Sequence, residues 1–246
     1  MDYSNVMKIG ILIPCTSKGR DWKTMRDTYL FHYTLRTFIA TSCPGHEYIF
    51  YIGYDVDDPV FSNKFEQDYL RIFNKFVTLR FIELNDPPGY LTKMWNHLFS
   101  IAHDEGCDYF FQCGDDILFR TYGWISDSIR VLKEHDDIGL TGPDNQNGRI
   151  LTQSFVSRKH MDIFGEYFPE SIINWGCDDW YNWVYEDYLY KLKGHICTNE
   201  GGQPRYVINH DESFDDDRTR NLGILRQRVL DLATKDRKKI QKYLKG

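Results

Sequence analysis

The chain has 246 residues, which suffices for one domain with a packed core and no disulfide or zinc staples. Hydrophobic residues make up 41% and aromatic residues 16%, a composition that excludes a largely disordered chain. The formal net charge of −6 argues against a general nucleic-acid binder, and it is uneven, at +8 over residues 218–246 and −14 over the rest.

The first half of the chain alternates short apolar runs with longer helical patterns. Strands are expected at 6–14, 47–54, 77–84, 108–113 and 138–141, and helices at 21–40, 63–76, 91–104 and 123–134. This βαβα order predicts an α/β fold with a mostly parallel central sheet and helices on both faces. In such sheets ligands bind at the carboxyl ends of the strands, here the loops 14–20, 54–59, 86–92 and 114–120.

The second half is less regular. Strands are expected at 150–156 and 204–208, and helices at 178–192 and 222–243. Leu222, Leu225, Val229 and Leu232 recur at helical spacing in the last of these. No linker rich in Pro, Gly or Ser divides the chain, so we expect one domain over residues 1–217 with a basic amphipathic helix over 218–246 as an extension.

The cysteines and the start of the chain bear on its compartment. The six cysteines form no CxxC pair, which predicts free and mostly buried thiols in a reducing compartment. No apolar run approaches the roughly 20 residues of a membrane span. The opening MDYSNVMKIGILIP indicates a first strand and not a secretion signal. We therefore expect a cytoplasmic protein without a transmembrane segment.

Two adjacent acids follow the fourth expected strand, in Gly114-Asp115-Asp116. Acids at the end of a buried strand are costly unless a cation compensates them. Mg²⁺ and Mn²⁺ often join one or two carboxylates to substrate phosphates. A solvated turn is the alternative, because Gly and Asp are common turn residues. The place of the acids at a strand's carboxyl end favours a metal–diphosphate site.

A histidine follows the last expected strand, in Asn209-His210-Asp211-Glu212. Neutral imidazole is a common ligand for transition metals, manganese among them. A single histidine is more often a surface or core-edge residue. The segment on its own therefore does not predict a metal site.

The segment 175–180, WGCDDW, places two acids between two tryptophans. Acids in the first turn of a helix interact favourably with the helix dipole, so N-capping is the simplest interpretation. Capping does not explain the flanking tryptophans, whose flat apolar faces suit sugar rings. Asp178 or Asp179 is therefore also a candidate general base in an aromatic-walled pocket.

Over roughly residues 7–211 the layout of the chain resembles the GT-A fold glycosyltransferases, which use nucleotide-sugar donors. The segment IGILIPCTSKGRDW is similar to the family's first strand and loop, and GYLTKMWNHLFSIAHDEGCDYFFQCGDDI to its helix, turn, strand and DxD motif. WGCDDW resembles the family's ED motif, and His210 its late metal-binding histidine. The chain departs from the pattern at Gly114, where the first Asp of DxD is usual, which leaves Asp116 with Asp115 in support.

The resemblance implies a set of positions around the donor. Asp55 or Asp57 would face the nucleobase at the end of the second strand, although a turn before Pro59 also explains these acids. Arg20 would approach the diphosphate. The residues assigned to nucleotide and donor binding are Pro14, Thr16, Ser17, Arg20, Asp55, Asp57, Lys93, Asn96 and Asp115.

The resemblance also implies a reaction. Asp116 and His210 would hold Mn²⁺ or Mg²⁺, which would offset charge on the leaving diphosphate of a UDP- or GDP-linked sugar. Asp179, or Asp178, would deprotonate the hydroxyl of an acceptor, expected to be a glycan or glycoconjugate. Such a base favours inversion, but retaining members lack one, so the stereochemistry stays open. Trp175 and Trp180 would bind the acceptor.

Two other functions fit parts of the sequence. A nucleotidyltransferase of related α/β fold would also need acidic metal ligands, although CTSKGR is a faint match to its basic glycine-rich loop. A carbohydrate-binding protein with an inactive site would suit Gly114 and the aromatic surplus. The motifs GxSxG, GxxxxGK[ST], GxGxxG and HExxH are absent, so the chemistries that they mark find no support.

The basic segment 218–246 has three interpretations. A helix that packs its apolar stripe on the body is the default. Weak peripheral attraction to an anionic membrane surface is the second, and an oligomer contact is the third.

Overall fold

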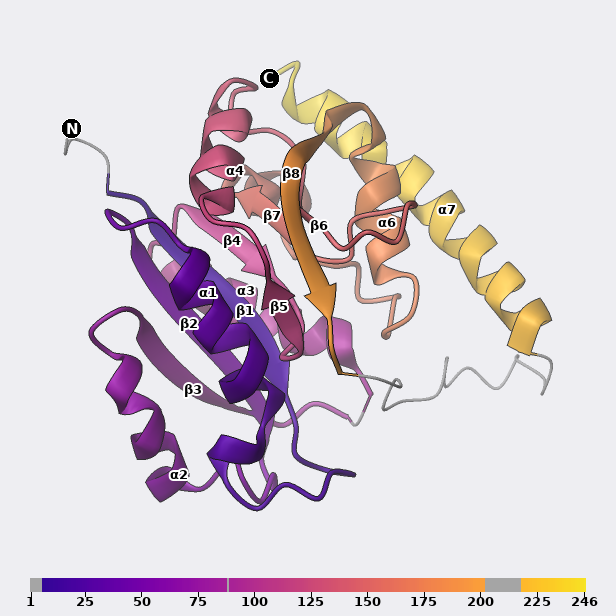
Figure 1. The fold of residues 1–246 in the computed structure, drawn as a ribbon. Helices are drawn as coiled ribbons and strands as arrows, with labels where there is room; N and C mark the ends of the chain where they lie inside the picture. Colours follow the sequence, from indigo (N-terminus) through magenta and orange to yellow (C-terminus); the bar gives the residue numbers. More distant parts are fainter. Residues whose placement is uncertain (1–5, 88, 202–217) are drawn as a thin grey trace.

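The structure is a computed structural model that describes residues 6–87, 89–201 and 218–246. Its centre is an eight-stranded sheet in the order β3-β2-β1-β4-β7-β6-β8-β5 (Figure 1). The strands are β1 (Lys8–Cys15), β2 (Glu47–Asp55), β3 (Thr78–Leu84), β4 (Tyr109–Gln112), β5 (Ile117–Phe119), β6 (Leu140–Asp144), β7 (Ser154–Ser157) and β8 (Leu189–Asn199). The α-helices are α1 (Arg36–Thr41), α2 (Lys64–Tyr69), α3 (Leu91–Asp104), α4 (Trp124–Lys133), α5 (Lys159–Phe164), α6 (Cys177–Val184) and α7 (Arg218–Tyr243).

The sheet is mixed, with four of its seven strand pairings parallel. The strands β3, β2, β1 and β4 run parallel, with Ile11 of β1 level with Phe50 on one side and Phe111 on the other. β7 then reverses direction against β4. The expected α/β class and mostly parallel sheet are confirmed, and the carboxyl ends of β1, β2 and β4 meet at one edge.

Alternating side chains of the central strands belong to two separate hydrophobic layers, one on each face of the sheet. On β1, Ile11 and Ile13 pack toward α1 and α4, whereas Leu12 packs toward α3. On β4, Phe111 faces the first layer and Phe110 the second. Because successive side chains of a strand point to opposite faces, a continuous apolar run requires cover on both. Figure 1 shows helices on each face of the sheet.

The helix expected at 91–104 is confirmed as α3. Several other expected elements differ from those found. The helix expected at 178–192 is wrong, because α6 ends at Val184, a 3₁₀ turn follows at Glu186–Tyr188, and β8 begins at Leu189. β5 was not expected, and the helix expected at 21–40 is broken into a 3₁₀ turn (Met25–Asp27), a π-helical turn (Leu30–Leu35) and α1. The strand expected at 204–208 and His210 lie outside the described residues.

The C-terminal helix α7 lies along the outside of the molecule beside α6 (Figure 1). Val229, Ala233 and Ile240 are buried in the same hydrophobic layer as Trp180 of α6. Asp236 is 3% exposed and accepts a hydrogen bond from the Trp180 indole nitrogen at 3.2 Å. The apolar stripe of α7 therefore completes the hydrophobic layer that contains Trp180.

Two further observations bear on the expectations about compartment. All six cysteines are free, and five of them are buried. Within the described ranges, no helix combines the length and the apolar character needed to cross a bilayer.

Candidate active site

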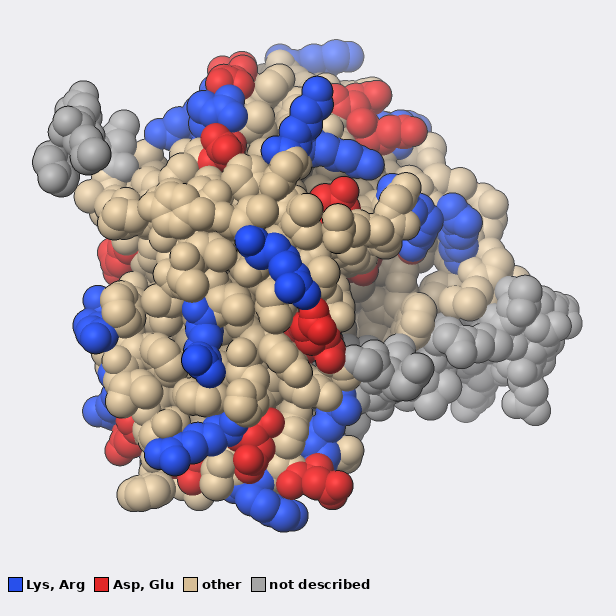
Figure 2. All heavy atoms as spheres, viewed as in Figure 1, with Lys and Arg blue, Asp and Glu red and all other residues tan. Residues whose placement is uncertain are grey.

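An acid-lined cavity of about 610 Å³ opens at the carboxyl ends of β1 and β4. Its walls come from the segment after β4, the loop 145–153 and the start of α6. Figure 2 shows the surface hollowed between the sheet body and the α6 side of the molecule. Four of its lining residues are the acids of the two expected motifs: Asp115, Asp116, Asp178 and Asp179. The fold thus brings together two segments that lie more than 60 positions apart.

The Gly-Asp-Asp segment leaves the buried strand β4 and leads at once into β5. Asp115 is 1% exposed, and the backbone carbonyl of Asp116 accepts a hydrogen bond from the Glu200 amide at 2.9 Å. A Cβ added at Gly114 would lie 2.7 Å from Asp116 Oδ1, and one added at Gly201 would lie 2.1 Å from its Oδ2. The two glycines therefore make room for the Asp116 carboxylate, which gives the departure from DxD at Gly114 a steric reason.

The carboxylate oxygens of this segment suit a hard divalent cation as ligands. Carboxylate oxygens are the ligands that Mg²⁺ and Mn²⁺ prefer. Within residues 6–87, 89–201 and 218–246, no three side chains of His, Cys, Asp or Glu converge as a metal cluster. Asp115 and Asp116 supply carboxylate oxygens of this kind at the cavity. The placement of His210 falls outside the described residues.

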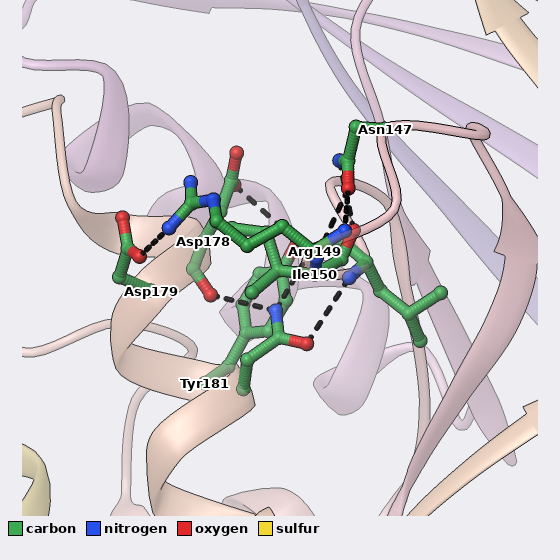
Figure 3. Close-up of polar contacts among 8 residues, drawn as sticks. Asn147, Arg149, Ile150, Asp178, Asp179 and Tyr181 are labelled. Atoms are coloured by element: carbon green, nitrogen blue, oxygen red, sulfur yellow. Dashed lines mark hydrogen bonds and ion pairs between the residues drawn. The ribbon is translucent and has the colours of Figure 1, made fainter.

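The second pair of acids stands in the first turn of α6. Gly176 precedes the helix in the left-handed region, at φ 86°, which glycine adopts readily. Asp179 forms an ion pair with Arg149 (Figure 3). Asp178 Oδ1 accepts hydrogen bonds from the Tyr181 hydroxyl at 3.3 Å and the Cys177 thiol at 3.6 Å. The two neighbouring carboxylates therefore have different partners.

The environment of Asp178 changes its acidity. Burial among packed side chains raises its pKa to about 7, and the negative charge of Asp179 acts in the same direction. The donors Cys177 and Tyr181 and the cation of Arg149 oppose the shift. The side chain nevertheless keeps part of its surface open to the cavity. A carboxyl with a pKa near neutrality is suited to take up a proton from a bound hydroxyl.

The loop that carries Arg149 is tied to α6. Asn182 accepts a hydrogen bond from the Leu151 amide at 3.1 Å and donates to the Leu151 carbonyl at 2.7 Å. Asn147 folds the loop by accepting from the amides of Arg149 and Ile150 at 2.7 and 3.0 Å (Figure 3). Arg149 is a site residue that sequence reasoning missed. The run Asn-Gln-Asn-Gly marks the turn, but no local signal indicates the partner of the arginine.

Besides Asp115, two of the expected donor residues line the cavity near the Gly-Asp-Asp segment. Pro14 lies there at the end of β1. Arg20 lies there as well, with its guanidinium carbon 5.1 Å from the ring centre of Tyr29 and 5.6 Å from that of Trp22. Its Nη2 donates to the Gly201 carbonyl at 3.5 Å. Arg20 thus supplies positive charge on the side of the cavity that holds Asp116.

The loops after β1 and β2 are joined by a carboxylate that sequence reasoning did not single out, Asp58. It is fully buried and accepts from the Ser17 amide and hydroxyl, each at 2.6 Å, and from the Thr16 hydroxyl at 3.1 Å. The amides of Val60 and Phe61 also donate to it, at 3.1 and 2.8 Å. Thr16 and Ser17 therefore shape this loop and do not line the acid-lined cavity.

The acids expected to face a nucleobase lie beside this loop. Asp55 and Asp57 both pair with Lys18, and neither lines the acid-lined cavity. Burial raises the pKa of Asp55, and the Lys18 cation opposes that shift. The Asp57 side chain is 72% exposed, and its hydrogen bond with Lys18 lowers its pKa. These two carboxylates hold Lys18 between the loops after β1 and β2.

Three expected site residues have their side chains elsewhere. Lys93 Nζ lies 5.3 Å from the centre of the Tyr90 ring. The Asn96 amide binds backbone groups of Tyr167 and Phe168, so it fixes the segment after α5. Trp180 is 1% exposed and belongs to the core.

Trp175 is the tryptophan of the WGCDDW segment that lines the acid-lined cavity. It keeps partial exposure there. Of the two tryptophans expected to bind an acceptor, Trp175 therefore lines the cavity and Trp180 does not.

Comparison with known proteins identifies the fold. No family model matches the sequence, and no curated protein matches it. S. aureus TarS 1-349 in complex with UDP is 14% identical, with a TM-score of 0.53 over 78% of this chain and 59% of that chain. In complex with UDP-GlcNAc the same protein gives a TM-score of 0.55 at 14% identity, over 82% and 62%. GalNAc-T7 with UDP, GalNAc and Mn²⁺ gives 0.56 at 10% identity, over 80% and 44%.

These likenesses show that the chain has the GT-A fold, as its sequence resemblance implies. The chain spans about three-fifths of the length of TarS 1-349.

Proposed function

We propose that the chain is a glycosyltransferase that moves a sugar from a nucleoside-diphosphate sugar to a hydroxyl acceptor. The observation that carries this proposal is one cavity of a GT-A fold with two acid pairs in different environments. One pair suits a cation and a diphosphate, and the other includes a carboxyl whose pKa is raised to about 7. The UDP, UDP-GlcNAc and Mn²⁺ in the similar structures support a UDP-linked donor and a divalent ion.

Asp116, supported by Asp115, would hold Mn²⁺ or Mg²⁺ together with the donor diphosphate. His210 is the further ligand that the sequence resemblance implies. A divalent ion bound there would neutralise charge on the departing diphosphate. Arg20 lies on the same side of the cavity and would bind the diphosphate through its guanidinium group. Asp55 and Asp57 stay candidates for contact with the nucleobase.

Asp178 is the preferred base of the two acids in α6. It would accept the proton of the acceptor hydroxyl while that oxygen bonds to the anomeric carbon and the bond from this carbon to the diphosphate oxygen breaks. Asp179 is held by Arg149, so this ion pair would position the acceptor and the helix start. Trp175 would stack on the acceptor sugar. A base on the acceptor side favours a single displacement with inversion.

A binding experiment tests the donor half of this proposal. UDP is titrated calorimetrically into the chain with and without Mn²⁺. The variant is Asp116→Asn, and the matched control is Asp104→Asn, an exposed acid outside the cavity. We expect Mn²⁺ to strengthen UDP binding in the wild type and the control, and Asp116→Asn to lose at least about tenfold in affinity, roughly 1.4 kcal/mol. UDP binding that ignores both Mn²⁺ and Asp116 would contradict the proposal.

A further inference from the structure

A second pocket of about 520 Å³ lies between α7 and the segment 171–175 that leads into α6. We call it the α7 pocket. Apolar side chains from both walls face it, and two cations of α7 stand among them. The residues that the argument uses are Ile172, Leu225, Val229, Leu232, Arg228 and Lys235.

The α7 pocket adjoins the acid-lined cavity. Asn174 and Trp175 line both of them. Asp178 follows Trp175 by three positions, through the turn at Gly176. A Cβ added at Gly176 would lie 2.9 Å from the Val229 side chain, so this turn packs directly on α7. A molecule in the α7 pocket would therefore touch the same tryptophan as a molecule at the candidate base.

The lining combines apolar surface with positive charge. Val229 is buried, whereas Leu225 and Leu232 are half-buried and keep apolar surface that a ligand can cover. Lys235 adds a cation to the lining, which also holds Arg228 and Asp231. Such a lining suits an apolar group that is attached to an anion, because the apolar part gains by leaving water and the anion by meeting cations.

The two cavities together suit one elongated molecule. An amphiphile could place a polar head in the acid-lined cavity and an apolar body against α7, with Trp175 between the two. A small free sugar would fill the first cavity and leave the second without an occupant. Pockets of this size commonly bind organic groups of drug-like dimensions.

We propose that the α7 pocket binds the apolar part of the acceptor substrate. The acceptor is then an amphiphile in which a hydroxyl-bearing head is joined through an anionic linkage to a hydrophobic group. The head lies against Trp175 and Asp178, the hydrophobic group against Leu225 and Leu232, and the anion near Lys235. This inference rests on the proposed glycosyl transfer, because it assigns the substrate class of the same site.

The test uses two simple probes, decyl phosphate and decyl β-glucoside, each below its micelle concentration. Binding to the full chain is measured by calorimetry for the wild type, Leu232→Gln and Lys235→Glu. The matched controls are Ile224→Gln and Lys238→Glu, exposed positions of the same helix that do not line the α7 pocket. UDP with Mn²⁺ is titrated into every variant in parallel.

Both probes should bind the wild type and both controls. Leu232→Gln should weaken both probes about tenfold, since it removes an apolar contact. Lys235→Glu should weaken decyl phosphate about three- to tenfold and leave decyl β-glucoside unchanged. UDP binding should be the same in all variants.

Three results would overturn the inference. UDP binding without probe binding, or probe binding that is equal in lining variants and controls, removes the α7 pocket as a subsite while the proposed function stands. Probe binding through Leu232 in a chain that binds no UDP refutes the proposed function, and the acceptor role falls with it.

Discussion

Replacement of Asp178 by asparagine separates the stability of the chain from its activity. Asparagine keeps the size of the side chain and an oxygen that can accept from Tyr181 and Cys177. It cannot ionise, so the cost of holding a charge among packed side chains disappears. The same change removes the proton acceptor of the proposed reaction. We therefore expect Asp178→Asn to be more stable than the wild type above neutral pH and much less active.

The magnitude follows from the pKa of this carboxyl, which rises from 3.8 to about 7 on folding. Between these two values the folded chain binds more protons than the unfolded chain, so stability falls as the pH rises. The loss begins near the unfolded pKa and is complete above the folded one. At about 1.4 kcal/mol per pKa unit, the advantage of asparagine over aspartate should grow by roughly 2–3 kcal/mol between pH 5 and pH 8.

Urea unfolding of both proteins at pH 5 and pH 8 measures this growth directly. Asp104→Asn is the matched control, because Asp104 is an exposed acid that does not line the cavity. In parallel, donor turnover by Asp178→Asn should fall about 10²- to 10⁴-fold, the usual contribution of a general base. A stability difference that is equal at the two pH values would refute the assigned environment of Asp178, and unchanged turnover would refute its role.

Three further changes test other parts of the site. Arg149→Gln removes a cation that lowers the pKa of Asp178, so the acidic limb of the pH–rate profile should move to higher pH. An acidic limb that does not move would show that the charge of Arg149 does not act on the base. Asp58→Asn leaves one acceptor oxygen where two serve five donors, so urea unfolding should show a loss of about 1–3 kcal/mol, and wild-type stability would contradict this. Gly201→Ala displaces the Asp116 carboxylate, so calorimetry should show weaker UDP binding with Mn²⁺, whereas unchanged affinity would argue against Asp116 as a ligand.

The parts of the fold that could be predicted are those whose pattern is set locally. β1 and β2 are continuous apolar runs, and α3 has a clear helical period over its whole length. β8 could not be separated from the preceding helix, because aromatic and apolar residues from 178 to 192 fit both periods. Its identity as a strand depends on pairing with β6 and β5. β5 has three residues, too few for a pattern.

The candidate site was predictable to the extent that its acids follow strands or open helices. Asp115, Asp116, Asp178 and Asp179 were found in this way, since the carboxyl ends of parallel strands meet at one edge. Pairings between distant segments were not predictable. Arg149 meets a partner 30 positions away, and Asp58 meets partners 41 and 42 positions away, with no local pattern to mark either.

Product analysis tests the central claim most directly. The chain is incubated with UDP-linked sugars and Mn²⁺, with and without a hydroxyl acceptor, and the nucleotide products are separated by anion exchange. The proposed glycosyl transfer predicts that UDP accumulates together with free or transferred sugar, and that Asp178→Asn reduces its rate. Release of pyrophosphate from a parallel incubation with UTP and a sugar 1-phosphate would indicate nucleotidyl transfer instead. No release of UDP from any UDP-linked donor, and no release of GDP from any GDP-linked donor, would contradict the assignment of this cavity as a glycosyltransferase active site.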